Sequence, residues 1–579
     1  MHERTTVGTV TPEELKTSIA AALSHVYPQA ADQSAPPIVV ERPKNRDHGD
    51  WASNVALQNA KRLGTTPRAL AEKIANELHE HPGITAVEVA GPGFLNITLG
   101  AGAAGQVAWD IVQAGSAYGS GKSLAGTSLN LEFVSANPTG PLHIGHTRWA
   151  ALGDAMSRVL RFAGAEVVSE YYINDAGSQM DVFTASVVAR MLGREVEEGG
   201  YPGAYIHDIA QQIVNDHPDY SAALRQAEVD QAEERQDDAS APPALAQASV
   251  PSHIWDGIKE AAYALQLRDI QQTLTDFGVS FDVWFSEREL HASGAVQQAV
   301  TRLREAGHVY DREGAIWLRT TDFGDDKDRV LIRQDGEPTY FAADAAYYLN
   351  KKDRGFAHKI YLLGADHHGY IGRLKALSAA AGDDPETSLE VLIGQLISIN
   401  GAKLSKRAGN IIELRDMIQW LGTDAVRYSL ARSPADSPLT LDPEVLRSAS
   451  NDNPVYYVQY AHARACAVER RAATVDIASA QFEASTLHHP TETALLVALA
   501  DFPRIVEYAA TLREPHRVAR YIEDTAGLFH KWYDSCRVTP VGEEPVTSVH
   551  SSRLVLAQAT RTVLSNGLGL LGVSAPEKM

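Results

Sequence analysis

The stretch LEFVSANPTGPLHIGHTRWAALGD, which occupies residues 131–154, decides the fold of this chain. It opens with apolar residues that are typical of a strand. The segment 137–141 then breaks the strand, because proline removes a backbone donor and restricts the residue before it. Apolar residues return at helical spacing from Leu142 onward. A strand, a turn and a helix in this order place the free N–H groups of the helix start beside the strand end, which predicts an anion site.

Two histidines mark the start of this helix. His143 and His146 are three residues apart, so they share one face of the first turn. Gly145 lies between them and has no side chain, so a flat ring could approach the backbone there. We therefore expect a nucleotide site, with phosphates near the two imidazoles and a base over the glycine.

Around this stretch, strand and helix patterns alternate from residue 131 to about 382, as in a doubly wound parallel sheet. A buried strand is predicted over 167–173, and Asn174 and Asp175 follow it directly. Ligands bind at the carboxyl ends of strands in such sheets, so both residues are candidates for the site. An ordinary turn is equally consistent with them.

Tyr340 and Asp344 lie on an Ala-rich helix that is predicted to follow Pro338. They are four residues apart, so the ring and the carboxylate share a face of that helix. A carboxylate on an otherwise apolar helix needs a partner, and an Arg guanidinium would supply it through a bidentate pair. An internal salt bridge is an equally good interpretation.

A cluster of Asp366, His367 and His368 follows a buried strand predicted over 360–364. Adjacent side chains on a strand point to opposite faces, so one metal ion does not suit all three. We expect one or two of them to contact substrate instead, and we predict no metal site in the protein.

The segment 399–410 contains three cations, Lys403, Lys406 and Arg407, among small residues. Such a loop can close over a polyphosphate and neutralise the charge that develops as it leaves. Basic loops are commonly just solvated, but the position of this one, after the sheet and the histidine motif, favours a functional interpretation.

The length of 579 residues indicates several domains. We predict an N-terminal α+β domain over 1–115, a Rossmann-type α/β catalytic domain over 116–441, and a helical bundle over 442–579. The catalytic domain carries an insertion at about 193–290, which includes a mobile acidic and Ala-rich loop at about 228–250.

The flanking domains have their own patterns. In the N-terminal part we expect helices from Pro12 and over 52–63 and 67–79, and strands over 38–40, 87–89 and 94–99. In the bundle we expect helices over 445–450, 455–469, 492–509, 515–538 and 552–571. The loop 41–51 combines basic residues with Trp51, which suits RNA contact, although a solvated loop is the simpler interpretation.

Bulk properties exclude several classes of protein. A formal net charge of −21 argues against a general nucleic-acid coat protein, although a local basic surface can exist on an acidic body. No apolar run is long enough to span a membrane, and the first residues lack a secretory signal, so we expect a cytoplasmic protein. The two cysteines, Cys466 and Cys536, have no zinc-type spacing. The segment 119–123 resembles a phosphate loop but fails its spacing, so we interpret it as a linker.

HIGH at 143–146 and KLSKR at 403–407 together resemble the paired signatures of class I aminoacyl-tRNA synthetases. Longer segments resemble the arginyl-tRNA synthetase family in particular, and the resemblance covers nearly the whole chain apart from 228–250. These segments are ERPKNRDHGDWASNVAL at 41–57, ANPTGPLHIGH at 136–146, YYINDAGSQ at 171–179, TYFAADAAYYLNK at 339–351 and NPVYYVQYAHAR at 453–464.

This resemblance implies a two-step reaction. Arginine and ATP would form arginyl-adenylate and pyrophosphate, and the terminal adenosine of the tRNA for arginine would then take the arginyl group, first on its 2′-hydroxyl. It further implies that tRNA is usually bound before activation, that Mg²⁺ accompanies ATP, and that the chain is a monomer. The N-terminal domain would contact tRNA, and the C-terminal bundle would bind the anticodon.

The resemblance also implies roles for single residues. The ATP site would comprise His143, Gly145, His146, Lys403, Ser405 and Lys406. The arginine site would comprise Ser135, Asn137, His146, Tyr340, Asp344 and His367. Within these sets, Tyr340 and Asp344 would read the guanidinium, and Lys403 and Lys406 would stabilise the leaving pyrophosphate. His367 stands where other members carry Gln.

Two alternatives remain open at this point. The first is a synthetase for another amino acid, although Asp344 disfavours acidic and apolar substrates, and the absence of a zinc-type cysteine set disfavours the cysteine enzyme. The second is a catalytically silent RNA-binding relative that uses only the terminal domains. A silent protein has no need of both intact motifs, so HIGH and KLSKR argue against it.

Overall fold

The computed structural model of the protein describes residues 12–28, 36–41, 43, 48–81, 83–234, 247–395, 397–400 and 412–579. The chain forms two compact units. One consists of Met1–Gly121 together with Ala449–Met579, and the other of Lys122–Ser448. Among the helices in the described ranges, none is both long enough and apolar enough to cross a membrane.

The second unit is built on a five-stranded parallel sheet with the order β12-β11-β5-β6-β7. Its strands are β5 (Ser128–Glu132), β6 (Glu166–Ile173), β7 (Val283–Ser286), β11 (His358–Gly364) and β12 (Leu389–Gly394). The chain runs from β5 to β6 and β7 in one direction, and later adds β11 and β12 on the other side. The predicted doubly wound parallel sheet is therefore confirmed, and its switch point lies between β5 and β11.

Helices connect and cover these strands. The ones that matter most for the site are α5 (Ile144–Phe162), which follows β5, and α12 (Tyr340–Asp353), which precedes β11. The others are α10 (Glu287–Ala292), α11 (Ala295–Glu305), α13 (Ile371–Ala380), α14 (Pro385–Ser388), α16 (Leu414–Leu421), α17 (Thr423–Ala431) and α18 (Pro443–Arg447), with the 3₁₀ turns η5 (Thr320–Phe323) and η6 (Ala365–Tyr370).

Two small sheets complete the core of this unit. An antiparallel sheet has the order β10-β9-β8, and β13 pairs in parallel with β14. Their strands are β8 (Val309–Arg312), β9 (Ala315–Leu318), β10 (Arg329–Ile332), β13 (Ile397–Ile399) and β14 (Leu439–Leu441). The sheet of β8, β9 and β10 lies in the chain between β7 and α12, and so within the α/β domain.

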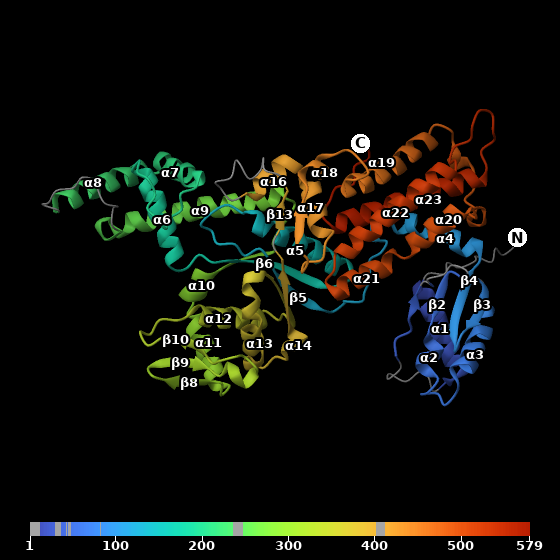
Figure 1. Cartoon of the computed structure of the whole chain (residues 1–579), viewed down its shortest axis with the longest axis horizontal. Helices are drawn as coiled ribbons and strands as arrows, with labels where there is room; N and C mark the ends of the chain where they lie inside the picture. Colours follow the sequence, from blue (N-terminus) through green and yellow to red (C-terminus); the bar gives the residue numbers. More distant parts are fainter. Residues whose placement is uncertain are drawn as a thin grey trace. The chain divides into compact units, whose positions relative to one another are not determined.

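The predicted insertion is helical, and its helices pack together with α6 (Ser178–Met191), which precedes it in the chain (Figure 1). The helices of the insertion are α7 (Ala204–Asp216), α8 (Pro218–Glu234) and α9 (Ser252–Asp276), and the turn η4 (Gln247–Ser249) lies between α8 and α9 in the chain. The loop predicted over 228–250 is wrong in its first part, because α8 continues to Glu234. Leu224 and Ala227 of α8 are buried in the insertion's own core, so tertiary packing extends the helix into the acidic segment. Residues 235–246 lie outside the described ranges.

The N-terminal part of the first unit is an α+β fold with an antiparallel sheet of order β1-β2-β4-β3. Its elements are α1 (Pro12–Val26), β1 (Val40–Glu41), β2 (Trp51–Ser53), α2 (Val55–Asn59), α3 (Pro67–His79), β3 (Ile84–Ala90) and β4 (Phe94–Leu99). The helix predicted over 52–63 is wrong at its start, because residues 51–53 pair with β4 and bury Trp51. Sheet pairing outweighs the local helical pattern there.

The C-terminal part of this unit is a helical bundle, as predicted. It contains α19 (Pro454–Ala472), α20 (Pro490–Ala500), α21 (Phe502–Leu512), α22 (His516–Ser535) and α23 (Ser548–Leu570), with the 3₁₀ turns η7 (Ile477–Ser479) and η8 (Ala484–Thr486). α4 (Ala101–Ala114), which leads into the turn η3 (Gly115–Ala117), packs against α20 and α23. The single helix predicted over 492–509 is two helices, which meet at Asp501 just before Pro503.

Candidate active site

A cavity of about 760 Å³ opens at the carboxyl ends of the strands of the parallel sheet. It brings together seven of the residues predicted from the sequence, although they come from separate parts of the chain: Ser135, Asn137, His143, Gly145, His146, Tyr340 and Asp344. Residues that the sequence reasoning missed also line it: Glu132, Val134, Trp149, Tyr172, Tyr347, Tyr361 and Gln395. The geometry is that of a ligand site at the switch point of an α/β sheet.

The backbone directly after β5 is held in an unusual conformation. Val134 and Ser135 have φ values of 69° and 41°, in the left-handed region that non-glycine residues rarely adopt. The Ser135 hydroxyl donates to Glu132 Oε1 at 3.2 Å and accepts from the backbone N–H of Tyr172 at 3.1 Å. These bonds hold the strand end in place. Two residues further on, the Asn137 amide donates to Gln179 Oε1 at 2.6 Å.

The two histidines form the first turn of α5. His143 is the N-cap, and its Nδ1 accepts from the Gly145 N–H at 3.1 Å, while His146 Nδ1 accepts from the His143 N–H at 3.4 Å. The ring centroids are 3.9 Å apart. Since Nδ1 acts as an acceptor in both rings, the ring proton of each neutral histidine belongs on Nε2. Both imidazoles are therefore hydrogen-bond donors through Nε2.

Burial keeps these rings uncharged. It lowers the pKa of His143, and it lowers the pKa of His146 to about 4, with the neighbouring His143 adding to the effect. At neutral pH the pair is therefore two neutral N–H donors, together with the N-terminal end of a 19-residue helix. This arrangement suits phosphate oxygens without adding two positive charges.

The structure gives a reason for a glycine at position 145 that the sequence did not reveal. A Cβ built there would lie 2.8 Å from Cε1 and 3.0 Å from Nδ1 of His143. Any side chain would therefore displace the His143 ring from the helix start. The prediction that a base lies over this glycine stays a prediction.

α12 carries the predicted guanidinium-reading pair. Thr339 caps the helix, Tyr340 is 71% exposed at its first position, and Asp344 lines the cavity one turn later. The Asp344 carboxylate accepts a hydrogen bond from the Tyr370 hydroxyl. Among the side chains that the structure describes, none forms an ion pair with Asp344, so the internal salt bridge considered above is not found there.

The pKa of Asp344 is raised to about 8, chiefly by burial and then by the negative charges of Glu287 and Glu132, which the cation Arg373 only partly offsets. An acid in this position gains most from a cationic ligand, because the ligand supplies the counter-charge that the protein withholds. The site is thus prepared for a positively charged group at its deep end.

Beneath the cavity lies a buried ionic network. Lys351 Nζ lies 2.6 Å from Glu132 Oε2, and the Lys351 side chain is fully buried. Glu170 accepts from the Tyr347 hydroxyl and from both terminal nitrogens of Arg354, at 2.6 and 2.9 Å. The sequence reasoning missed this network because its members are up to 219 residues apart. The available signal was the spacing of Tyr347 and Lys351, which share a helix face with Asp344.

The two residues after β6 differ in role. Asn174 lines the cavity. Asp175 is buried and accepts from the hydroxyls of Tyr263 and Ser286, at 3.0 and 2.7 Å, and from the Arg288 N–H at 3.0 Å. It therefore ties the insertion and the end of β7 to this corner of the sheet. His367 lies in η6, and its side chain is outside what the structure describes.

Lys403, Ser405 and Lys406 lie outside the described residues. The chain that follows them is placed, and it is attached to the start of α5. The Ile144 N–H donates to the Ile412 carbonyl at 2.9 Å, and the Leu414 N–H donates to the Leu142 carbonyl at 2.8 Å. The buried Arg148 reinforces this region by donating to three backbone carbonyls: those of Gln395, Pro434 and Ser437.

The described part of the chain contains no group of three His, Cys, Asp or Glu side chains that could hold a metal ion. The functional groups that the cavity itself offers are carboxylates, neutral imidazoles, amides and phenols. These groups can bind and orient ligands, and they can stabilise charge on phosphate oxygens.

Three family models match consecutive parts of the chain. They are described as the arginyl-tRNA synthetase N-terminal domain (residues 13–99), the catalytic domain of class I (R) tRNA synthetases (117–428) and the DALR anticodon binding domain (458–579). The catalytic match alone spans more than half of the chain.

Relatives with high identity agree with these models. The chain is 61% identical to an arginine–tRNA ligase of Paenarthrobacter aurescens, over 98% of this chain and the whole of the relative. It is 58% identical to that of Micrococcus luteus, again over 98% of the chain and the whole relative. The solved arginyl-tRNA synthetase of Thermus thermophilus shares the fold, with a TM-score of 0.71 at 22% identity, covering 98% of this chain and all of that one.

Proposed function

The chain belongs to the arginyl-tRNA synthetase family, and from that membership we propose how its residues divide the family's reaction. The enzyme activates L-arginine with ATP to form arginyl-adenylate and diphosphate, and it transfers the arginyl group to the 3′ end of the tRNA for arginine. The observation that best supports the division of roles is the meeting of Asp344 with His143 and His146 around one cavity.

The deep end of the cavity takes the guanidinium. The Asp344 carboxylate lines the cavity and has a raised pKa, so a bound guanidinium both ionises it and neutralises it. Tyr340 closes over the same ligand from the exposed edge, and the family resemblance implies that His367 belongs to the same arginine site. Ser135, Asn137 and His146 hold the amino and carboxylate groups of arginine near the α-phosphate.

The other end takes ATP. The Nε2–H groups of His143 and His146 and the N-terminus of α5 donate to phosphate oxygens, and Gly145 leaves room for the base. The arginine carboxylate then attacks the α-phosphorus and diphosphate leaves. Lys403, Ser405 and Lys406 stabilise the negative charge that builds on the leaving diphosphate. Positioning and charge stabilisation suffice for this step, so no general base is needed.

The family resemblance implies that ATP would be bound as its Mg²⁺ complex. The ion commonly keeps several waters and binds through substrate phosphates with one or two carboxylates, so it does not need a dedicated protein cage. Bound to the triphosphate, the ion would offset part of its charge.

The remaining parts handle the tRNA. The C-terminal bundle binds the anticodon, and the N-terminal α+β domain contacts the tRNA body. We propose a monomer, as the family resemblance implies, working in the cytoplasm, where charged tRNA is used.

Aminoacylation across the amino acids with total tRNA tests this proposal. We expect charging with arginine alone, and ATP–diphosphate exchange that depends on both arginine and tRNA. Charging with another amino acid would refute the guanidinium pocket. A lack of exchange with every amino acid would favour the silent RNA-binding relative instead. A gel-filtration measurement at the assay concentration tests the monomer.

A further inference from the structure

One face of α12 is continuous from the mouth of the cavity to the buried core. Tyr340, Asp344, Tyr347 and Lys351 lie at intervals of four, three and four residues, which places them along a single helical stripe. The first three line the cavity, whereas Lys351 is 0% exposed and lies behind the cavity wall. A lysine at the buried end of a binding stripe needs an explanation, because an ammonium without water is costly unless it is paired.

Lys351 contacts three residues that line the cavity. Its Nζ lies 2.6 Å from Glu132 Oε2, and 4.3 Å and 3.9 Å from the ring centroids of Tyr347 and Tyr361. Each of these three partners lines the cavity. The ammonium therefore supports the wall of the pocket from behind, through one ion pair and two ring faces.

Glu132 is the link between this lysine and the ligand. Its Oε2 faces Lys351, and its Oε1 accepts from the Ser135 hydroxyl in the strained turn after β5. Glu132 also adds to the negative potential at Asp344, together with Glu287. Two cations oppose these carboxylates: Arg373 acts on Asp344, and Lys351 pairs with Glu132. The hydroxyls of Tyr370 and Tyr172 bond to Asp344 and Glu287.

We propose that Lys351 is a positioning residue for arginine recognition, which holds the Glu132 carboxylate in the pocket wall and offsets its charge so that Asp344 can ionise for the guanidinium. The inference rests on the proposed function and goes beyond it, because Lys351 touches no substrate. It assigns a specificity role to a residue that the cavity itself does not expose.

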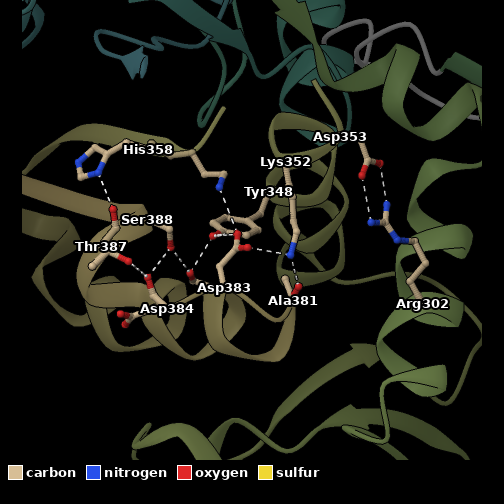
Figure 2. A network of polar contacts seen from close by, with 12 residues as sticks. Arg302, Tyr348, Lys352, Asp353, His358, Ala381, Asp383, Asp384, Thr387 and Ser388 are labelled. Carbon is tan, nitrogen blue, oxygen red and sulfur yellow. Dashed lines mark hydrogen bonds and ion pairs between the residues drawn. The ribbon is translucent and has the colours of Figure 1, made fainter. Parts of the chain in front are cut away.

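The next residue along the chain provides a matched control. Lys352 belongs to a different network, in which its Nζ lies 2.7 Å from Asp383 Oδ1 and also meets the Ala381 carbonyl (Figure 2). Asp383 accepts from Tyr348 and Lys359 as well. None of these partners lines the cavity. Removing either lysine thus removes one cation and one ion pair from the same helix, but only one of the two pairs adjoins the site.

The experiment compares Lys351→Met, Lys351→Arg and Lys352→Met with the unchanged protein in aminoacylation at saturating ATP and tRNA. In Lys351→Met, Glu132 loses its counter-charge, so the Asp344 carboxyl in the pocket keeps its proton to higher pH. A rise of one unit in the pKa of Asp344 raises the KM for arginine roughly tenfold at pH 7 but only roughly threefold at pH 8.5. The KM for ATP and the kcat at saturating arginine stay within roughly twofold of the unchanged protein, since neither depends on that charge.

Lys351→Arg keeps the cation and should bring the KM–pH profile back toward that of the unchanged protein, and Lys352→Met should leave the profile unmoved. If Lys351→Met is too unstable to assay, Glu132→Gln with Lys351→Met removes both charges together. The midpoint of its KM–pH profile should then lie at or below that of the unchanged protein, whatever its absolute KM.

The proposal is overturned if Lys351→Met raises the KM for arginine by the same factor at both pH values. It is also overturned if the variant changes the KM for ATP and the KM for arginine alike, because a purely structural lysine would do that. Failure of the proposed function would look different, since the unchanged protein would then not charge tRNA with arginine at all.

Discussion

The raised pKa of Asp344 makes a sharp prediction about how arginine affinity depends on pH. The free pocket holds this carboxyl with a pKa of about 8, because burial and the charges of Glu287 and Glu132 disfavour the ionised form. Arginine binds the ionised form and lowers that pKa, so binding releases a proton. Raising the pH toward 8 therefore strengthens binding, and above 8 the affinity levels off.

The size of the effect follows from the fraction of pockets that are ionised before arginine arrives. For a pKa of about 8, that fraction is about 1% at pH 6, about 9% at pH 7 and about 50% at pH 8. The KM for arginine should therefore be roughly 100-fold, 11-fold and twofold above its plateau at these three pH values. Below pH 7 the plot of log KM against pH should have a slope close to −1.

The assay is aminoacylation of the tRNA for arginine between pH 6.0 and 8.5, with ATP and tRNA saturating and the KM for ATP measured beside it. Asp344→Asn is the matched variant, because an amide cannot ionise. Its KM should not follow this pH dependence, and it should exceed the plateau by the loss of a bidentate charged pair, on the order of 2–4 kcal/mol or roughly 30- to 800-fold. A KM for arginine that is constant from pH 6 to 8 in the unchanged protein would refute the reasoning, and so would equal slopes in both proteins.

Three further predictions concern the rest of the site. His146→Ala should lower kcat roughly 10²- to 10³-fold, because it removes one preorganised hydrogen-bond donor. In the unchanged protein, kcat should show no titration of His146 between pH 6 and 8, since the pKa of this histidine is about 4. Rapid-quench or steady-state measurements of kcat check both predictions. Lys406→Ala should lower kcat by a similar factor while the KM for arginine stays within roughly threefold, and a large change in that KM alone would contradict its role at the diphosphate. Gly394→Ala should lower the free energy of unfolding by roughly 1–3 kcal/mol, because the added Cβ would lie 1.4 Å from Trp149 in the cavity wall. Denaturant titrations measure this change. Gly372→Ala is the control, because its added Cβ would meet only an Asp325 oxygen at 3.6 Å.

Local patterns were enough to predict the elements that carry the site. The strand–turn–helix at 131–154 is present as β5 and α5, and the i, i+4 spacing of Tyr340 and Asp344 is realised on α12. Such patterns work because the periodicity of apolar residues and the constraints of proline and glycine act within a few residues. The predictions that failed, at 52–63, 228–234 and 492–509, are places where sheet pairing, buried packing or a proline outweighed the local signal.

By itself, the sequence predicted the parallel sheet, the helical bundle, and some of the residues that line the cavity at the strand ends. Only the tertiary structure decided their chemical state. Glu132 and Lys351 are 219 residues apart in the chain, and nothing in the spacing of either one indicates that they pair. The pKa of Asp344, the neutral state of His146 and the need for Gly145 likewise depend on which groups lie within a few ångströms and on how much water is excluded. Charge interactions act through space rather than along the chain, so these properties exist only once the fold has brought the groups together.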